Sequence, residues 1–245
     1  MNVQSPPSMP RRVMIATPSL TGNLDVSYVW SLCETIKMSV GRNIIIAPMF
    51  LPQNSIIQAA RDELLAIAHQ AQADDMIWID ADISWKPEWI FKLLDYPVDV
   101  VGGTYRLKQD ESEDYALKAQ PWMLKADSHG LMQVEALGFG FVRFSKRAID
   151  WLWDNSDPYW DNEQERRWAF DVRPRMNPRN NYRVNLLGED IGLCNRLREE
   201  GGFTINLDPA MTCDHIGAKK FRGDFRVQAE KFYCEEQLEL KETAA

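Results

Sequence analysis

Apolar stretches of strand length alternate with helical patterns through the first 105 residues of the chain. Apolar runs within 13–17, 42–50, 76–80 and 98–105 predict four strands. The intervening residues 25–40, 54–72 and 86–96 repeat apolar side chains every three or four positions, as amphipathic helices do. Strands that alternate with helices form a mostly parallel sheet with helices on both faces. We therefore predict a single α/β domain of Rossmann-like type.

The two longest predicted helices each have an apolar face that we expect to pack on the sheet. In the first helix this face holds Val26, Val29 (or Trp30), Cys33 and Ile36. The second helix is capped by Asn54 or Ser55, and its face holds Ile57, Ala60, Leu64, Ile67, Ala68 and Ala71. Arg61 lies on this otherwise apolar face, so its guanidinium needs an anionic partner, either an acid of the core or a bound nucleotide.

The second half of the chain is less regular. Residues 106–130 match no pattern. Residues 135–152 predict a strand with a glycine-rich start followed by a helix, residues 152–185 a long loop or lid, residues 188–202 a helix, and residues 204–217 a last pair of strands. We expect one domain over 13–223. A disordered lead at 1–12 would precede it, and a tail at 224–245, a polar helix or partly disordered, would follow it.

Composition narrows the class of protein. The chain of 245 residues is 45% apolar and 26% charged, which is typical of a globular protein, and its net charge of −8 argues against a surface covered in nucleic acid. None of the four cysteines forms a C-x-x-C pair, so we predict free thiols and neither a zinc knuckle nor a thioredoxin-like motif. The N-terminus has no apolar segment typical of a secretory signal, and the longest apolar run is too short to span a bilayer. We therefore expect a cytoplasmic protein without a membrane segment.

Two acids follow the third predicted strand. Asp80 and Asp82 come directly after an apolar run and before a helix, at the carboxyl end of a strand, where ligands of such sheets bind. The simpler interpretation is a pair of acids that cap the next turn. Carboxylate oxygens suit hard divalent ions such as Mg²⁺ or Mn²⁺, which usually carry a phosphate-bearing substrate. The alternative is therefore a divalent ion that holds a diphosphate.

One of the three histidines lies in a context that suggests a ligand. His215 follows a predicted strand and precedes a basic run of Lys219, Lys220 and Arg222, which either faces a diphosphate or is a solvated surface. An imidazole beside two carboxylates shifts the metal preference from Mg²⁺ toward Mn²⁺. His69 and His129 are better explained as packed or exposed side chains.

Glu189 and Asp190 open a predicted helix after Gly188. Acids at a helix start are favoured by capping and by the helix dipole, which is the simpler explanation. The functional alternative makes one of them a general base that takes a proton from an acceptor hydroxyl.

Taken in order, these segments resemble the GT-A class of nucleotide-sugar-dependent glycosyltransferases. The matching pieces are "VMIATPS", "QAARDELL", "WIDADI", "GFGFVRFSKRAIDWL", "GEDIGLCNRL" and "DHIG", which together cover about 13 to 217. The short chain looks most like the enzymes of this class found in bacteriophage genomes. The resemblance implies a GT-A-like fold whose residues 13–105 bind the nucleotide sugar and whose residues 106–223 serve the acceptor and the metal.

The resemblance also implies roles for individual residues. Asp80 and Asp82 resemble the D-x-D motif, with Ala81 between them, Asp82 the more direct metal ligand and Asp80 nearer the ribose. His215 resembles the late metal-binding histidine, and Asp190 the base of inverting members, with Glu189 as a neighbour that orients it or contacts the acceptor. Thr17 and Pro18 would lie beside the nucleobase, with Arg61 nearby. Gly138, Phe139 and Gly140 would line the floor of the site between donor and acceptor. The implied cofactor is Mn²⁺ or Mg²⁺, and a UDP-sugar is the favoured donor.

The acceptor is suggested by a basic stretch just before the predicted base. Residues 166–184 hold six arginines and one acid, together with Trp168, Phe170 and Tyr182. These arginines either pair with acids such as Glu163 and Glu165 or form a platform for the phosphate backbone of a nucleic acid. In the second case a nucleobase would be flipped out of the strand toward Asp190. The second interpretation assigns Arg173, Arg175 and Arg179 to DNA with hydroxymethylated pyrimidines.

Other functions fit part of the pattern. The acceptor could instead be a glycan or a lipopolysaccharide, because aromatic residues also stack on sugars. A nucleotidyltransferase would also use paired acids and a metal, but its phosphate loop should be rich in glycine, and residues 17–25 hold a single glycine. A catalytically inactive module that binds a nucleotide sugar would tolerate loss of the acids, which are all present.

Overall fold

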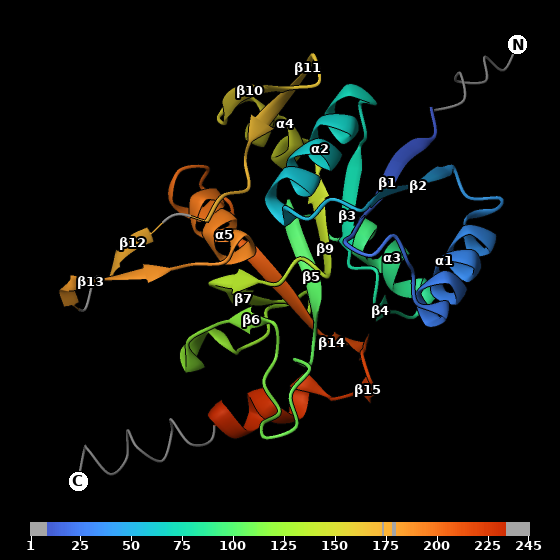
Figure 1. The fold of residues 1–245 in the computed structure, drawn as a ribbon. Coiled ribbons are helices and arrows are strands. Elements are labelled where there is room, and N and C mark those ends of the chain that lie inside the picture. The colour runs from blue at the N-terminus through green and yellow to red at the C-terminus, as the bar shows by residue number, and fades with distance from the viewer. Residues whose placement is uncertain (1–8, 173, 178–179, 234–245) are drawn as a thin grey trace, which may run out of the picture.

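The computed structural model describes residues 9–172, 174–177 and 180–233, with side chains described up to residue 172 and again from 186. The chain folds into one mixed α/β domain around a large, mostly parallel sheet (Figure 1). The path through this sheet runs β15-β14-β5-β9-β3-β1-β2. These strands are β1 (Arg11–Ser19), β2 (Ile44–Pro52), β3 (Asp75–Ile79), β5 (Val100–Tyr105), β9 (Phe141–Ser145), β14 (Ile205–Ile216) and β15 (Lys220–Phe221). The predicted α/β class with a mostly parallel sheet is confirmed.

One central strand runs against its neighbours. β9 pairs antiparallel with both β3 and β5, so β3 and β5 point the same way although they do not touch. β1 is parallel to β2 and β3, and β14 is parallel to β5. The carboxyl ends of β1, β3, β5 and β14 therefore meet at one edge of the sheet. Short strands β4 (Ile83–Ser84) and β7 (Met132–Val134) add to β14.

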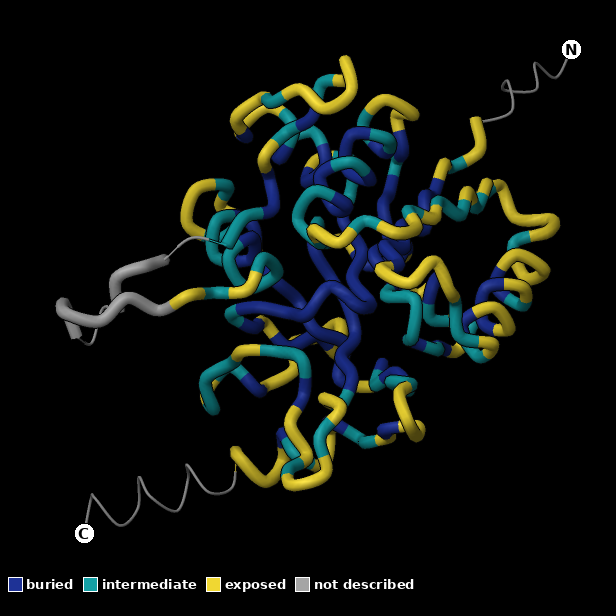
Figure 2. Tube along the Cα trace, viewed as in Figure 1, coloured by how far each residue is buried: buried dark blue, intermediate teal, exposed yellow. Residues whose placement is uncertain are grey.

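The alternation of side chains along the strands builds two hydrophobic cores. In β1 and β3, Met14 and Met76 point into the first core, whereas Ile15 and Ile77 point into the second. The first core also receives α2 (Ile57–Gln70), α4 (Lys146–Asp154) and α5 (Glu189–Glu199), and the second receives α1 (Val26–Ser39) and α3 (Pro87–Asp95). Helices thus cover both faces, and Figure 2 shows buried residues along the central strands.

Helix α1 is rotated relative to the sequence prediction. Its buried residues are Tyr28, Ser31, Leu32 and Thr35, whereas Val26, Val29, Trp30 and Ile36 are exposed. The prediction of the apolar face was wrong because the buried polar groups find partners far along the chain. The Tyr28 hydroxyl lies 2.6 Å from Thr17 Oγ1, and the Trp85 indole N–H donates to Thr35 Oγ1 at 3.0 Å. Helix α2 buries Ala60, Leu64 and Ala68 as predicted. Its N-cap is Ile56 rather than Asn54 or Ser55, although the Asn54 side chain accepts from the Ile56 N–H at 3.0 Å.

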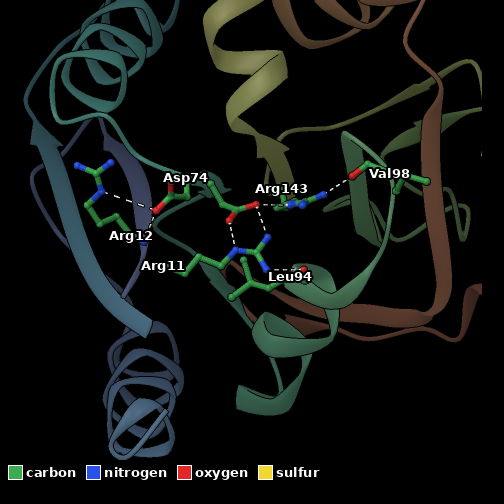
Figure 3. Close-up of polar contacts among 7 residues, drawn as sticks. Arg11, Arg12, Asp74, Leu94, Val98 and Arg143 are labelled. Atoms are coloured by element: carbon green, nitrogen blue, oxygen red, sulfur yellow. Dashed lines mark hydrogen bonds and ion pairs between the residues drawn. The ribbon is translucent and has the colours of Figure 1, made fainter. Parts of the chain in front are cut away.

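A buried ionic network joins strands at the end of the sheet opposite to the carboxyl ends of β1 and β3 (Figure 3). Asp75 opens β3 and is almost completely buried. Its carboxylate accepts from Arg11 Nε at 2.5 Å and from Arg143 Nε at 2.7 Å, which ties together β1, β3 and β9. Arg11 and Arg12 were expected to belong to a disordered lead, but they form the start of β1; residues 1–8 lie outside the described part.

Two segments are more regular than predicted. Where a loop or lid was expected, β10 (Asp157–Asp161) pairs with β11 (Gln164–Trp168), and β12 (Pro174–Asn177) pairs with β13 (Asn180–Leu186). The first hairpin turns at Asn162 and Glu163, both with positive φ, as a tight two-residue turn requires. The expected last pair of strands is the single strand β14, in which a register shift between Leu207 and Thr212 accommodates Pro209.

The segments without a clear sequence pattern form short pieces of structure. Within 106–130, Arg106 bridges to Tyr115, β6 (Leu117–Lys118) pairs with β8 (Ala136–Leu137), and a 3-10 turn spans Pro121–Met123. Residues 225–233 of the predicted tail are helical. Cys33, Cys194 and Cys213 are free thiols. Within the described residues, no helix combines the length and the apolar character that crossing a bilayer requires.

Candidate active site

A cavity of about 770 Å³ opens at the edge of the sheet where the carboxyl ends of β1, β3, β5 and β14 meet. This volume lies within the range of small-molecule sites. The cavity is lined by the β1–α1 loop, by the residues after β3, and by Tyr105, Leu107 and the end of β14. Of the residues predicted for the site, it is lined by Pro18, Arg61, Asp80, Ala81, Asp82, Glu189 and His215.

Backbone hydrogen bonds fix the loop that carries the two acids. The Ala81 carbonyl accepts from the Asp25 N–H at 3.0 Å, which joins the loop to the start of α1. The Asp82 carbonyl accepts from the Ile216 N–H at 2.8 Å, and His215 is paired with Ile83 in the β4–β14 ladder. His215 therefore lies beside Asp82, although more than 130 residues separate them in the chain.

Arg61 lies between two acids on one side of the cavity. Its Nη2 is 3.4 Å from Asp80 Oδ1, and its Nε is 3.5 Å from Glu189 Oε1. The guanidinium is buried, with its carbon 5.5 Å from the ring centroids of both Trp78 and Phe139. Burial raises the pKa of Asp80, and the Arg61 charge opposes this shift. Among the described residues, the buried Arg61 Nη1 has no hydrogen-bond partner.

Asp82 and His215 form a second group on the other side. His215 Nε2 lies 3.6 Å from Asp82 Oδ1, and Lys108 Nζ makes an ion pair with Asp82 Oδ2. Burial raises the pKa of Asp82, but the hydrogen bonds from His215 and Lys108 outweigh it, so the pKa lies below its ordinary value. The Asp82 carboxylate is consequently held in its charged form, ready to bind a cation.

The donor set fits a divalent ion in part. His215 Nδ1 donates to the Arg106 carbonyl oxygen at 2.9 Å, which orients the ring with Nε2 toward Asp82; a metal ion bound at Nε2 would take the place of the proton that His215 donates to Asp82. In the described part of the chain, however, no three His, Cys, Asp or Glu side chains converge closely enough to hold a metal. Asp80 lines the same cavity but is held by Arg61, and the Lys108 ammonium lies beside Asp82 where a metal cation would bind.

Glu189 and Asp190 open helix α5 but face different surroundings. Glu189 lines the cavity. Asp190 is not among the residues that line it, and its Oδ1 accepts from the Ile191 N–H at 2.7 Å. Burial, followed by the charge of Glu189, raises the pKa of Asp190, which favours proton uptake closer to neutral pH.

The other predicted residues lie around the cavity rather than in it. Thr17 is buried behind Pro18, and Phe139 is buried under Arg61. Gly138 and Gly140 make room for Tyr105, which lines the cavity: a Cβ atom on these glycines would lie 2.7 Å and 2.5 Å from the tyrosine ring or its hydroxyl. The basic residues Lys219 and Lys220 do not line the cavity, and Lys219 pairs with Asp110 instead.

The predicted arginine platform lies largely outside the described part. Arg173 and Arg179 are outside the described residues, and so is the side chain of Arg175. Of the others, Arg166 is buried and lies 3.5 Å from Glu63, and Arg167 pairs with Glu165 at 2.5 Å. The pairing of Arg167 with Glu165 matches the simpler of the two interpretations.

Sequence reasoning missed Tyr105 and Lys108. Tyr105 is the last residue of β5 and Lys108 follows three residues later, so the rule that ligands bind beyond the carboxyl ends of strands would have pointed to both. The end of β1 and the loop after it also contribute Ser19, Thr21 and Asn23 to the cavity.

Comparison with known proteins bears on the fold. No protein-family model matches the sequence, and no curated protein matches it. Among solved structures, the crystal structure of A197 from STIV is similar, with a TM-score of 0.54, 15% identity, and 84% of this chain and 86% of that chain covered. A crystal structure described as a "Putative Glucose-1-Phosphate Thymidylyltransferase" from Bacillus anthracis, in complex with a sucrose, gives a TM-score of 0.33 at 8% identity, over 60% of this chain and 76% of that chain. This second likeness is too slight to carry an argument. The mixed α/β architecture is compatible with a Rossmann-like GT-A fold.

Proposed function

We propose that this protein is a metal-dependent glycosyltransferase that moves a sugar from a nucleoside diphosphate sugar to an acceptor hydroxyl. The observation that carries the proposal is the convergence of Arg61, Asp80, Asp82, Glu189 and His215 around one cavity at the carboxyl edge of the sheet. A cavity of this kind offers a carboxylate and an imidazole for a cation, and a buried guanidinium for the anion that the cation accompanies.

The donor would bind through its diphosphate. Arg61 lines the cavity, and its guanidinium is held in place by Asp80 and Glu189. A fixed guanidinium in a buried site binds phosphate oxygens strongly because little rotamer freedom is lost on binding. The nucleoside would lie along the β1–α1 loop, next to Pro18.

Asp82 and His215 would hold Mn²⁺ or Mg²⁺, with Asp80 near the ribose. When bound, the ion neutralises the charge that develops on the leaving diphosphate. Lys108 pairs with Asp82 Oδ2, whereas His215 lies nearest Oδ1, so an ion held by Asp82 and His215 would bind close to the Lys108 ammonium and be opposed by its charge.

Asp190 would take the proton from the acceptor hydroxyl, giving inversion at the anomeric carbon. Burial and the neighbouring Glu189 raise the pKa of Asp190, which suits a general base. Glu189 is paired with Arg61 and so serves to position the guanidinium. Asp190→Asn should abolish transfer and leave donor affinity nearly unchanged. A collapse of donor affinity in this variant would make Asp190 a structural cap.

The test of the donor site measures metal-dependent binding. Thermal stabilisation with Mn²⁺ is screened against UDP-, GDP- and dTDP-sugars, and a ligand at 100 times its dissociation constant adds about 2.7 kcal/mol of stability. Asp82→Asn should lose this stabilisation, whereas Asp110→Asn, the same change at an exposed site outside the cavity, should keep it. Metal-dependent binding that is unchanged in Asp82→Asn would refute the site. Release of pyrophosphate from a nucleoside triphosphate and a sugar phosphate, without sugar transfer, would indicate a nucleotidyltransferase.

The acceptor in this proposal is DNA with hydroxymethylated pyrimidines. The support is the excess of arginine in 166–184, together with the resemblance to short bacteriophage enzymes. DNA affinity should fall with salt by a log–log slope of roughly −0.9 per phosphate contacted, and Arg→Glu changes at 173, 175 and 179 should flatten it. Transfer to a glycan, without salt-dependent binding of DNA, would replace this acceptor and leave the donor site intact.

A further inference from the structure

A second cavity lies beside the start of α2 and is independent of the site described above. It has a volume of about 410 Å³, and α2, the β10–β11 hairpin and the residues after β11 enclose it. Figure 1 shows this hairpin beside α2. At 100° per residue, Ile57 and Arg61 face the first cavity, and Gln58 and Asp62 lie about a third of a turn further round the helix, facing the second.

Aromatic side chains form much of its wall. Tyr159, Trp168 and Phe170 all line the cavity. Phe170 is fully buried and packs edge-on against Trp78, with ring centroids 5.3 Å apart, so this part of the wall is fixed by the core. Trp168 is 52% exposed, which leaves much of its indole free to contact a ligand.

An acid lies at the base of these aromatic walls. Asp62 is only 3% exposed, and its Oδ1 accepts from the N–H groups of Ala169 and Phe170, each at 3.0 Å. Within the part of the chain that the structure describes, its Oδ2 accepts one hydrogen bond, from the Tyr159 hydroxyl at 3.4 Å. Oδ2 therefore keeps most of its capacity to accept a hydrogen bond. Burial raises the pKa of Asp62 to about 7, because water can no longer stabilise the charge.

Among the described residues that line this cavity, the charged side chains are acidic. Asp171 also lines the cavity and acts on Asp62 through its negative charge, and no lysine or arginine is among the described residues that line it. An anionic ligand would be repelled by the ionised Asp62. A sugar with several hydroxyls would leave most of them unpaired against the apolar walls.

We propose that this cavity binds a small organic cation with an apolar or aromatic body, whose ammonium group donates to Asp62 Oδ2. The positive charge would offset that of Asp62, and the aromatic faces would attract the cation through their electron-rich rings. The apolar body would fill the space between Trp168 and Tyr159.

Two probes of nearly the same shape, one charged and one neutral, separate the contribution of charge to binding from that of shape. Benzylammonium and benzyl alcohol have nearly the same size, and isothermal titration calorimetry at pH 8 compares their affinities when Asp62 is ionised. Because hydrogen bonds to charged groups are stronger than neutral ones, we expect the ammonium to bind about 10-fold more tightly. Equal affinities, or binding of neither probe, would overturn the proposal. Nα-acetyl-lysine methylamide tests for a protein side chain as occupant, and tighter binding of this probe would exclude the small aromatic cation.

Asp62→Asn tests the anchor without emptying the site. Asparagine can still accept from the two backbone N–H groups but carries no charge, so the preference for the ammonium should fall to about 1 while weak binding of the alcohol persists. Asp161→Asn makes the same change in charge at an exposed position on the same hairpin and should keep the preference. Circular dichroism verifies that both variants fold. A preference that survives in Asp62→Asn would refute the role of Asp62.

Discussion

Asp62 should make the stability of the protein depend on pH in a direction unusual for an aspartate. Burial raises the pKa of Asp62 to about 7 in the folded state, while an unfolded aspartate has a pKa of about 3.9. Between these values the folded protein keeps a proton that the unfolded chain has released. The free energy of unfolding therefore falls as pH rises from about 4 to about 7, and this contribution is constant outside that window.

The magnitude follows from the size of the shift. A difference of about 3 pKa units at about 1.4 kcal/mol each sets a ceiling of about 4 kcal/mol on the cost of ionising Asp62 in the folded state. Asp62→Asn removes this cost and keeps an acceptor for the N–H groups of Ala169 and Phe170. The variant should thus be more stable than the natural protein at pH 8, and its advantage at pH 8 should exceed that at pH 5 by about 2.5 kcal/mol.

Urea unfolding of both proteins at pH 5 and pH 8 measures this difference. Asp161→Asn, the matched change at an exposed position, should show no such dependence on pH. If the difference in unfolding free energy between Asp62→Asn and the natural protein is the same at both pH values, the reasoning from burial fails. If the variant is less stable at both, the lost carboxylate matters more as a hydrogen-bond acceptor than as a buried charge.

Three further changes probe the sheet and the site. Asp75→Asn removes the buried charge that Arg11 and Arg143 share, so the free energy of unfolding in urea should fall by about 3 kcal/mol. An unchanged unfolding midpoint would contradict a stabilising role of this network. Gly103→Ala would place a Cβ atom 2.2 Å from the Met211 carbonyl oxygen, so stability should fall by about 3 kcal/mol. A variant as stable as the natural protein would show that β5 and β14 are not packed this closely. Lys108→Ala removes the cation paired with Asp82, so Mn²⁺ titrated alone should bind about 10-fold more tightly, equivalent to about 1.4 kcal/mol. Unchanged affinity would mean that the Lys108 ammonium and Mn²⁺ do not compete.

The positions of strands and helices could be predicted because they depend on spacing within each segment. The runs that became β1, β2, β3 and β5 are apolar over strand length, and the pattern in α2 repeats with the period of a helix. The carboxyl ends of such strands meet at one edge of a parallel sheet. This is why Asp80, Asp82 and His215, taken from distant parts of the sequence, could be expected at the same cavity.

Which face of a helix turns inward depends on partners elsewhere in the chain. In α1 the local pattern favoured Val26 and Ile36, but the structure buries Tyr28 and Thr35 because Thr17 and Trp85 satisfy their hydroxyl groups. A hydroxyl can be buried at little cost once it has a hydrogen-bond partner, and no local pattern shows whether that partner exists.

The sequence by itself therefore determined the class of fold and the edge of the sheet where a ligand would bind. Tertiary structure alone decided that β9 runs antiparallel between β3 and β5, that Lys108 pairs with Asp82, and that Asp62 and aromatic side chains line one cavity. The physical reason is how far apart in the chain the residues lie that each property depends on. Periodicity is a property of neighbouring residues, whereas the charge and solvation of a side chain depend on groups that only the folded chain brings within a few ångströms.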